Sequence, residues 1–151
     1  MNIFYVDTDP KIAAQSLCDK HVVKMILESA QMLCTARNSL GYPSTYKSAY
    51  VNHPSNKWVR SSYNHYDWLF QHYAELCNEY IHRYNKNHKC FDLFWELSSN
   101  PVEDFGFIPP PQCMPDDYKC DDTVQAYRNY YKYGKAHILK YTKRERPEWL
   151  K

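Results

Sequence analysis

Three residues whose side chains can transfer protons or attack carbon share one face of a predicted helix near the start of the chain. His21, Lys24 and Glu28 are three and four residues apart, and seven residues span two helical turns, so their side chains lie on the same side. Charged groups among core residues are unfavourable unless they are paired or used, which makes this cluster a candidate catalytic site. The alternative is that Lys24 and Glu28 form a solvated ion pair and that His21 is a structural histidine. The same face also carries four residues typical of a core, Ala14, Cys18, Met25 and Met32.

A basic, tyrosine-rich segment close to the C-terminus is a candidate nucleic-acid surface. Between Arg128 and Arg146 the chain has seven lysines and arginines and a single acid, Glu145. Cations that neutralise phosphates, interleaved with rings that stack on bases, are typical of nucleic-acid binding. The alternative is a solvated helix face whose tyrosines belong to the core. The interleaved rings are Tyr127, Tyr130, Tyr131, Tyr133 and Tyr141.

The elements that must position these residues are predicted to be helices. Asp9 and Pro10 are an N-cap and a first-turn proline, and they predict a helix over residues 10–38. Ser55 is expected to cap a second helix over residues 56–86, where apolar and aromatic residues recur at steps of three and four. The sequence leaves open whether this helix kinks near Ser61 and Ser62.

The remainder of the chain is expected to form a loop and one more helix. Five prolines exclude a continuous helix over residues 98–120, and a last helix is expected from Thr123 onward, after two aspartates. We therefore predict an all-α fold, a compact single-domain bundle of residues 1–151 with three main helices and a long proline-rich loop.

Composition excludes several classes of protein. No run of eighteen apolar residues is present, and the N-terminus lacks the basic and apolar regions of a secretory signal. We expect a cytoplasmic protein, in the host cell if its source is viral. The three glycines form no phosphate-binding loop, and no Gly-x-Ser-x-Gly motif is present, so ATP-driven and serine-hydrolase chemistry are not expected.

Six scattered cysteines without an export signal predict free thiols. A zinc site is an alternative, but only Cys18 and His21 have a compact ligand spacing. We therefore expect neither a metal nor another cofactor.

Three ordered segments of the chain resemble the pyrimidine-dimer DNA glycosylases with abasic-site lyase activity, called endonuclease V enzymes. Asp19-Lys20-His21, with Glu28 seven residues after the histidine, is similar to a motif on the long first helix of that family. The aromatic and acidic run from His65 to Tyr80 resembles the family's next long helix. Tyr130-Tyr131-Lys132-Tyr133-Gly134-Lys135-Ala136 resembles its C-terminal segment.

The resemblance implies an all-α domain and a covalent mechanism. In that family the N-terminal α-amine attacks the sugar C1′ of the damaged nucleotide, a Schiff base forms, and β-elimination can then nick the strand. A free α-amine has an unperturbed pKa of about 8 and is a better nucleophile near neutral pH than a lysine, at about 10.4. Glu28 would stabilise positive charge at the sugar and assist proton transfers, with His21 and Lys24 in support.

The chain departs from the family at several positions. The family's amine belongs to a small residue exposed by removal of the initiator methionine, whereas Asn2 is too large for efficient removal of Met1. The nucleophile is therefore the amine of Met1, that of Asn2 after unusual processing, or Lys24. The arginines beside the family's glutamate are replaced by Leu27 and Gln31.

These departures leave two functions open. The first is a glycosylase and lyase acting on pyrimidine dimers or another damaged or modified base in double-stranded DNA, as a monomer without a membrane partner. The second is a non-catalytic nucleic-acid-binding phage protein that interferes with host enzymes. The candidate DNA contacts are Lys20, Arg37, His53, Arg128, Lys132, Tyr133, Lys135 and Lys140.

Overall fold

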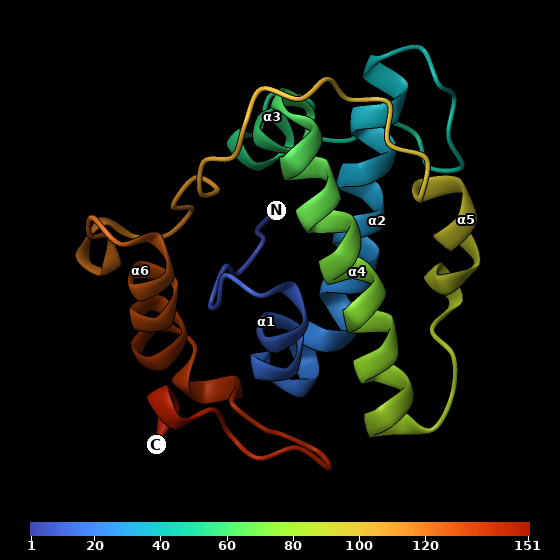
Figure 1. Ribbon diagram of the computed structural model, residues 1–151. Coiled ribbons are helices and arrows are strands. Elements are labelled where there is room, and N and C mark those ends of the chain that lie inside the picture. The colour runs from blue at the N-terminus through green and yellow to red at the C-terminus, as the bar shows by residue number, and fades with distance from the viewer.

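Two long antiparallel-packed helices form the centre of the molecule. The computed structural model describes residues 1–151 and contains six α-helices and no strands, so the all-α prediction is confirmed. α2 (Asp19–Ser39) and α4 (Tyr63–Tyr84) pack against each other. α6 (Thr123–Asn129) lies on the opposite side of the N-terminal arm, residues 1–9, from these two helices (Figure 1). The other helices are α1 (Pro10–Ser16), α3 (Pro54–Ser61) and α5 (Phe94–Leu97). No helix combines the length and the apolar character that crossing a membrane requires.

The predicted helix over residues 10–38 is in fact two helices, so that prediction was wrong at Leu17 and Cys18. Both residues have extended backbone, and neither is a glycine or a proline. The backbone N–H of Cys18 donates to Tyr131 Oη at 2.8 Å, and that of Asp19 donates to Lys140 O at 2.8 Å. Partners more than a hundred residues away thus replace the helical hydrogen bonds, which no local pattern could indicate.

The second predicted helix is also divided, at Ser62. This residue is extended, and its hydroxyl donates to Gly106 O at 2.6 Å and accepts from Phe105 N, which ties the helix break to the proline-rich loop. His53, and not Ser55, caps α3, because its Nδ1 accepts from Ser55 N at 3.1 Å. Ser55 itself is buried inside the first turn.

The segments after α4 agree more closely with the prediction. Residues 98–120 form a loop that runs from α5 over the ends of α4 and α3 toward α6 (Figure 1). α6 is short and continues as a π-helical turn over Tyr130–Gly134. A Cβ on Gly134 would lie 2.7 Å from Tyr130 Cδ1, so only glycine lets this tyrosine fold back over the turn.

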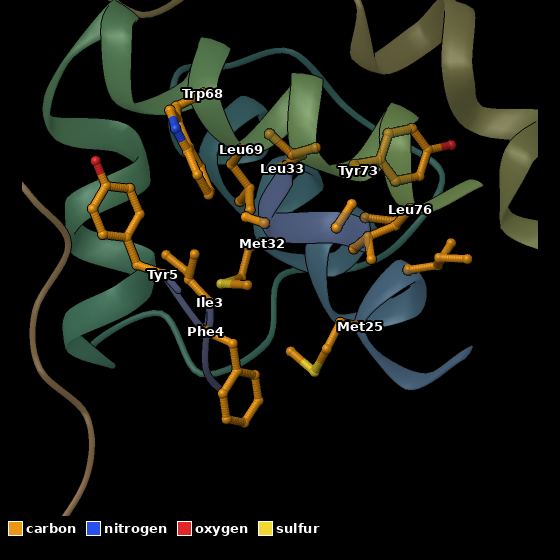
Figure 2. Packing of buried hydrophobic residues seen from close by; sticks show 14 of the residues in the cluster. Ile3, Phe4, Tyr5, Met25, Met32, Leu33, Trp68, Leu69, Tyr73 and Leu76 are labelled. Carbon is orange, nitrogen blue, oxygen red and sulfur yellow. The ribbon is translucent and has the colours of Figure 1, made fainter. Parts of the chain in front are cut away.

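The N-terminal arm is buried in the core. Ile3, Phe4 and Tyr5 are at most 5% exposed, and Figure 2 shows them beside Met25 and Met32 of α2. Phe4 and Tyr5 point to different sides of the arm. Burial on this scale holds the first residues of the chain against α2.

A buried ion-pair network fastens α2 to the end of α4. The Arg83 side chain is fully buried and donates to Asp19 at 3.0 Å and to Glu79 at 2.7 Å. Asp19 also accepts from the backbone and hydroxyl of Thr142, and Glu79 accepts from Arg144. Burial alone would raise the pKa of Asp19, but the hydrogen bonds from Thr142 and Arg83 outweigh it and lower that pKa. The aspartate of the Asp-x-His motif therefore holds the fold together.

We expect Asp19→Asn to destabilise the protein. The substitution removes one carboxylate from a buried arginine, and breaking such a pair costs roughly 3 kcal/mol of unfolding free energy. Urea unfolding at pH 7 measures the change. Asp117→Asn, at an exposed position, is the matched control and should leave the free energy within about 0.5 kcal/mol. Equal stability of the two variants would contradict the structural role of Asp19.

Candidate active site

A cavity of about 340 Å³ opens where the N-terminal arm meets the middle of α2. The arm, α2, the residue before α3, the proline-rich loop and the π-helical turn all contribute to its wall. Its lining residues are Met1, Asn2, Phe4, His21, Lys24, Met25, Glu28, His53, Cys113, Tyr130 and Lys135. The structure thus brings the five catalytic candidates together with His53 and Lys135.

Glu28 lies between two amines in this cavity. The α-amine of Met1 is 3.9 Å from Glu28 Oε1, and Lys24 Nζ is 3.4 Å from Oε2. Glu28 is the only acidic residue in the lining. The Glu28 side chain is 15% exposed, whereas that of Lys24 is 67% exposed. The carboxylate is therefore semi-buried next to one amine on the packed arm and one on a solvated side chain.

His21 is held in one orientation by the core. Its ring stacks on Phe4 with centroids 4.3 Å apart, and its Nδ1 lies 2.8 Å from Tyr131 Oη. Burial, together with the positive charges of Lys135, Lys24 and Lys20, lowers the pKa of His21 to about 4. The imidazole is therefore neutral at pH 7 and cannot serve as a cation for phosphate.

Two buried histidines, His21 and His72, make the fold sensitive to acid. The pKa of His21 and that of His72 are lowered from 6.5 to about 4, mainly by burial. At a pH between the unfolded and the folded pKa, the unfolded chain binds more protons than the folded one. The free energy of unfolding therefore falls as the pH decreases through this range. At pH 5 the loss should be roughly 2 kcal/mol for each histidine. Urea unfolding at pH 7.5 and pH 5 measures it.

A histidine-to-glutamine pair controls this prediction. His21→Gln should remove roughly 2 kcal/mol of the difference between the two pH values, whereas His137→Gln, at an exposed position, should leave that difference unchanged. A free energy of unfolding that is the same at both pH values would show that these histidines are not kept neutral by the fold.

Phe4 has an unusual backbone for an aromatic residue. Its φ is 54°, in the left-handed region that non-glycine residues seldom adopt. Backbone strain of this kind persists only where the surrounding structure enforces it, and it concentrates at functional sites. Here the Phe4 ring stacks on His21 and also on Tyr130, with the Phe4 and Tyr130 ring centroids 6.1 Å apart. These contacts hold the Phe4 ring in the cavity wall.

The other predicted DNA-binding residues fall into two groups. Lys20 and Lys140 line a neighbouring groove of about 650 Å³ that shares Lys24 with the cavity. Lys132 and Tyr133 are exposed on the π-helical turn, with the ammonium group 5.6 Å from the centre of the ring. Lys135 and His53 line the cavity itself, Lys20 and Lys140 line the neighbouring groove, and Lys132 and Tyr133 are exposed on the turn that carries Tyr130 of the cavity wall.

Arg37 and Arg128 are placed differently. Arg37 is buried, donates to Ser44 Oγ and to Ser99 O, and is not among the cavity residues. Arg128 donates to Val6 O at 2.8 Å and pairs with Asp7, so it fastens the N-terminal arm. Intramolecular partners occupy both guanidinium groups, and neither arginine enters the function proposed below.

Four residues of the cavity were not predicted as site residues. Phe4 and Cys113 were given no role in the site, Tyr130 was one of the interleaved tyrosines, and Met25 was counted among the core residues. The resemblance at residues 130–136 pointed toward Tyr130, but no local signal marks Cys113, because its place depends on the path of the whole proline-rich loop. All six cysteines are free, and no group of three or more His, Cys, Asp or Glu side chains is arranged to hold a metal ion.

The arrangement defines a class of protein: a helical domain whose cavity holds an amine and a carboxylate beside exposed cations. A protein-family model described as pyrimidine dimer DNA glycosylase matches residues 1–92, which include Met1, His21, Lys24 and Glu28. The chain belongs to this family of DNA glycosylases. Searches of the curated proteins and of the solved structures found no match.

Proposed function

We propose that the protein removes pyrimidine dimers from double-stranded DNA and then cleaves the abasic strand, with the α-amine of Met1 as nucleophile. The proposal extends to a monomeric enzyme that acts as one domain over residues 1–151. The observation that carries it is the 3.9 Å separation between this amine and the Glu28 carboxylate inside the cavity. A primary amine beside a carboxylate is the pair that imine chemistry at a sugar requires.

In the first step the amine nitrogen attacks C1′ of the damaged nucleotide. The C1′–N1 bond breaks and its electrons leave with the pyrimidine, which takes up a proton. The Glu28 carboxylate stabilises the positive charge that develops at C1′ as this bond breaks, and it accepts the proton that the attacking amine loses. Glu28 then gives this proton to O4′ as the C1′–O4′ bond breaks, which opens the sugar, leaves a protonated imine and restores the carboxylate.

The second step is elimination from the imine. Loss of a proton from C2′ expels the 3′ phosphate and breaks the strand, and water then releases the enzyme amine from the sugar. Glu28 is the acidic group of the cavity available to accept the C2′ proton. Lys24 and Lys135 supply positive charge beside the phosphates, and the exposed Lys132 and Tyr133 extend that surface.

Borohydride trapping tests the proposed reaction. The purified protein is mixed with a duplex containing one thymine dimer, or one abasic site, and reduced during turnover. We expect a stable protein–DNA adduct with both substrates and a nicked strand in the unreduced reaction. An undamaged duplex of the same sequence is the control.

A binding-only protein is the second candidate, because Leu27 is 39% exposed at a position where the family has an arginine. This candidate predicts salt-sensitive affinity for DNA, with log K falling linearly against log salt, and neither adduct nor nick. Any nicking in a single turnover would remove it, and binding without an adduct on either substrate would overturn the glycosylase and lyase proposal.

A further inference from the structure

The first two residues of the chain are fastened at several points. The side chain of Met1 is only 3% exposed, and its Sδ accepts from Asn56 Nδ2 at 3.6 Å. Asn2 Nδ2 donates to Cys113 O at 2.8 Å, and Asn2 Oδ1 accepts from Phe4 N at 2.9 Å. The end of the arm is therefore fixed to α3, to the proline-rich loop and to its own next turn.

These contacts decide where the first amine lies. Asn2 joins the proline-rich loop on one side to the strained residue Phe4, at φ 54°, on the other. The α-amine of Met1 is one residue before Asn2 and 3.9 Å from Glu28 Oε1. Loss of the two Asn2 hydrogen bonds would free the first two residues of the chain to rotate, and an amine displaced by about 1 Å can lose about 100-fold in rate.

The same contacts argue for a retained Met1. Its side chain fills a buried position, and Asn2 is too large for efficient removal of the methionine before it. If Met1 were absent, the first amine would belong to Asn2, whose side chain is already committed to Cys113 and Phe4.

We infer that Asn2 is a positioning residue that holds the amine of a retained Met1 against Glu28. This inference rests on the proposed function for its catalytic consequence, but the placement of the amine is a separate property that can be measured without DNA. Asn2 acts through Met1 and does not touch the reacting sugar.

The experiment compares Asn2→Leu, which loses both hydrogen bonds, with Asn2→Asp, which keeps only the acceptor for Phe4 N. Intact mass first establishes that Met1 is present in each protein. Three quantities are then measured: the single-turnover rate of imine trapping, the Kd for the damaged duplex, and the rate at which dilute acetic anhydride acetylates the α-amine. Asn64→Leu, which loses an exposed hydrogen bond to Asp104, is the matched control.

We expect Asn2→Leu to lower the trapping rate about 10- to 100-fold with an unchanged Kd. The trapping rate of Asn2→Asp should lie between those of Asn2→Leu and the wild type. Acetylation of Met1 should be several-fold faster in Asn2→Leu, because the amine leaves its contact with Glu28. A merely structural role would instead lower the melting temperature and weaken DNA binding together with the trapping rate.

The labelling rate separates the two proposals. Faster acetylation in Asn2→Leu, with no adduct from the wild type, would keep the positioning inference and remove the proposed reaction. Wild-type rates of trapping and acetylation in Asn2→Leu, with Met1 intact, would overturn the positioning inference. A mature chain that lacks Met1 would also overturn it.

Discussion

Glu28→Gln should lower the single-turnover rate of base release about 1,000-fold while leaving the affinity for DNA nearly unchanged. Glutamine keeps the size of the side chain but can neither accept a proton nor oppose positive charge at the sugar. Removing general acid–base catalysis costs about 10²- to 10⁴-fold, and a 1,000-fold loss corresponds to about 4 kcal/mol of transition-state stabilisation. Quenched-flow assays on a duplex with one thymine dimer measure the rate.

The matched control for this variant is Glu103→Gln, at an exposed position of the proline-rich loop. Its rate should equal that of the wild type. The stability of Glu28→Gln should change by less than about 1 kcal/mol, because Lys24 is 67% exposed, the Met1 amine is 3.9 Å from the carboxylate, and exposed or loose ion pairs contribute little. A Glu28→Gln rate within threefold of the wild type would remove Glu28 from the mechanism.

The helix that carries the candidate site could be predicted from the sequence because its signal is local. The spacing of His21, Lys24 and Glu28 depends only on helical geometry, and α2 contains all three residues. The all-α class was equally accessible, because the apolar periodicity of α2 and α4 extends over six turns.

The break at Leu17–Cys18 could not be predicted in this way, and near Ser62 the sequence left a kink open without deciding it. Each break is stabilised by hydrogen bonds that its residues donate to distant segments, to Tyr131 and Lys140 in the first case and to Gly106 of the proline-rich loop in the second. Helix propensity favours continuity at these positions, and tertiary contacts override it.

The roles of the basic residues were the least predictable part of the site. Arg37 and Lys135 look equivalent in a sequence, but Arg37 is buried against Ser44 and Ser99, whereas Lys135 lies over Tyr130 in the cavity wall. Whether a cation reaches solvent depends on the packing of remote segments, so charge counting identified a basic segment without separating its structural members from its exposed ones.

An additional residue before Met1 should strongly slow imine formation. A single glycine left by protease cleavage converts the α-amine of Met1 into an amide and moves the free amine by up to about 3.8 Å along the chain. That displacement is comparable to the whole 3.9 Å separation between Met1 and Glu28, so the amine leaves the carboxylate. We expect trapping to fall at least about 100-fold. The same glycine added at the C-terminus is the control.

Lys24→Met completes this experiment, because Lys24 Nζ is the other amine beside Glu28, at 3.4 Å. If Met1 attacks, this variant should keep trapping within about tenfold of the wild type and lose chiefly affinity for DNA, since one phosphate contact is removed. Peptide mapping of the reduced adduct identifies the modified nitrogen directly. An adduct on Lys24, together with normal trapping by the extended chain, would assign the attack to the lysine. The solvated position of Lys24 speaks against that assignment, because an exposed ammonium group is strongly hydrated and its flexible side chain is not held in one place against the sugar.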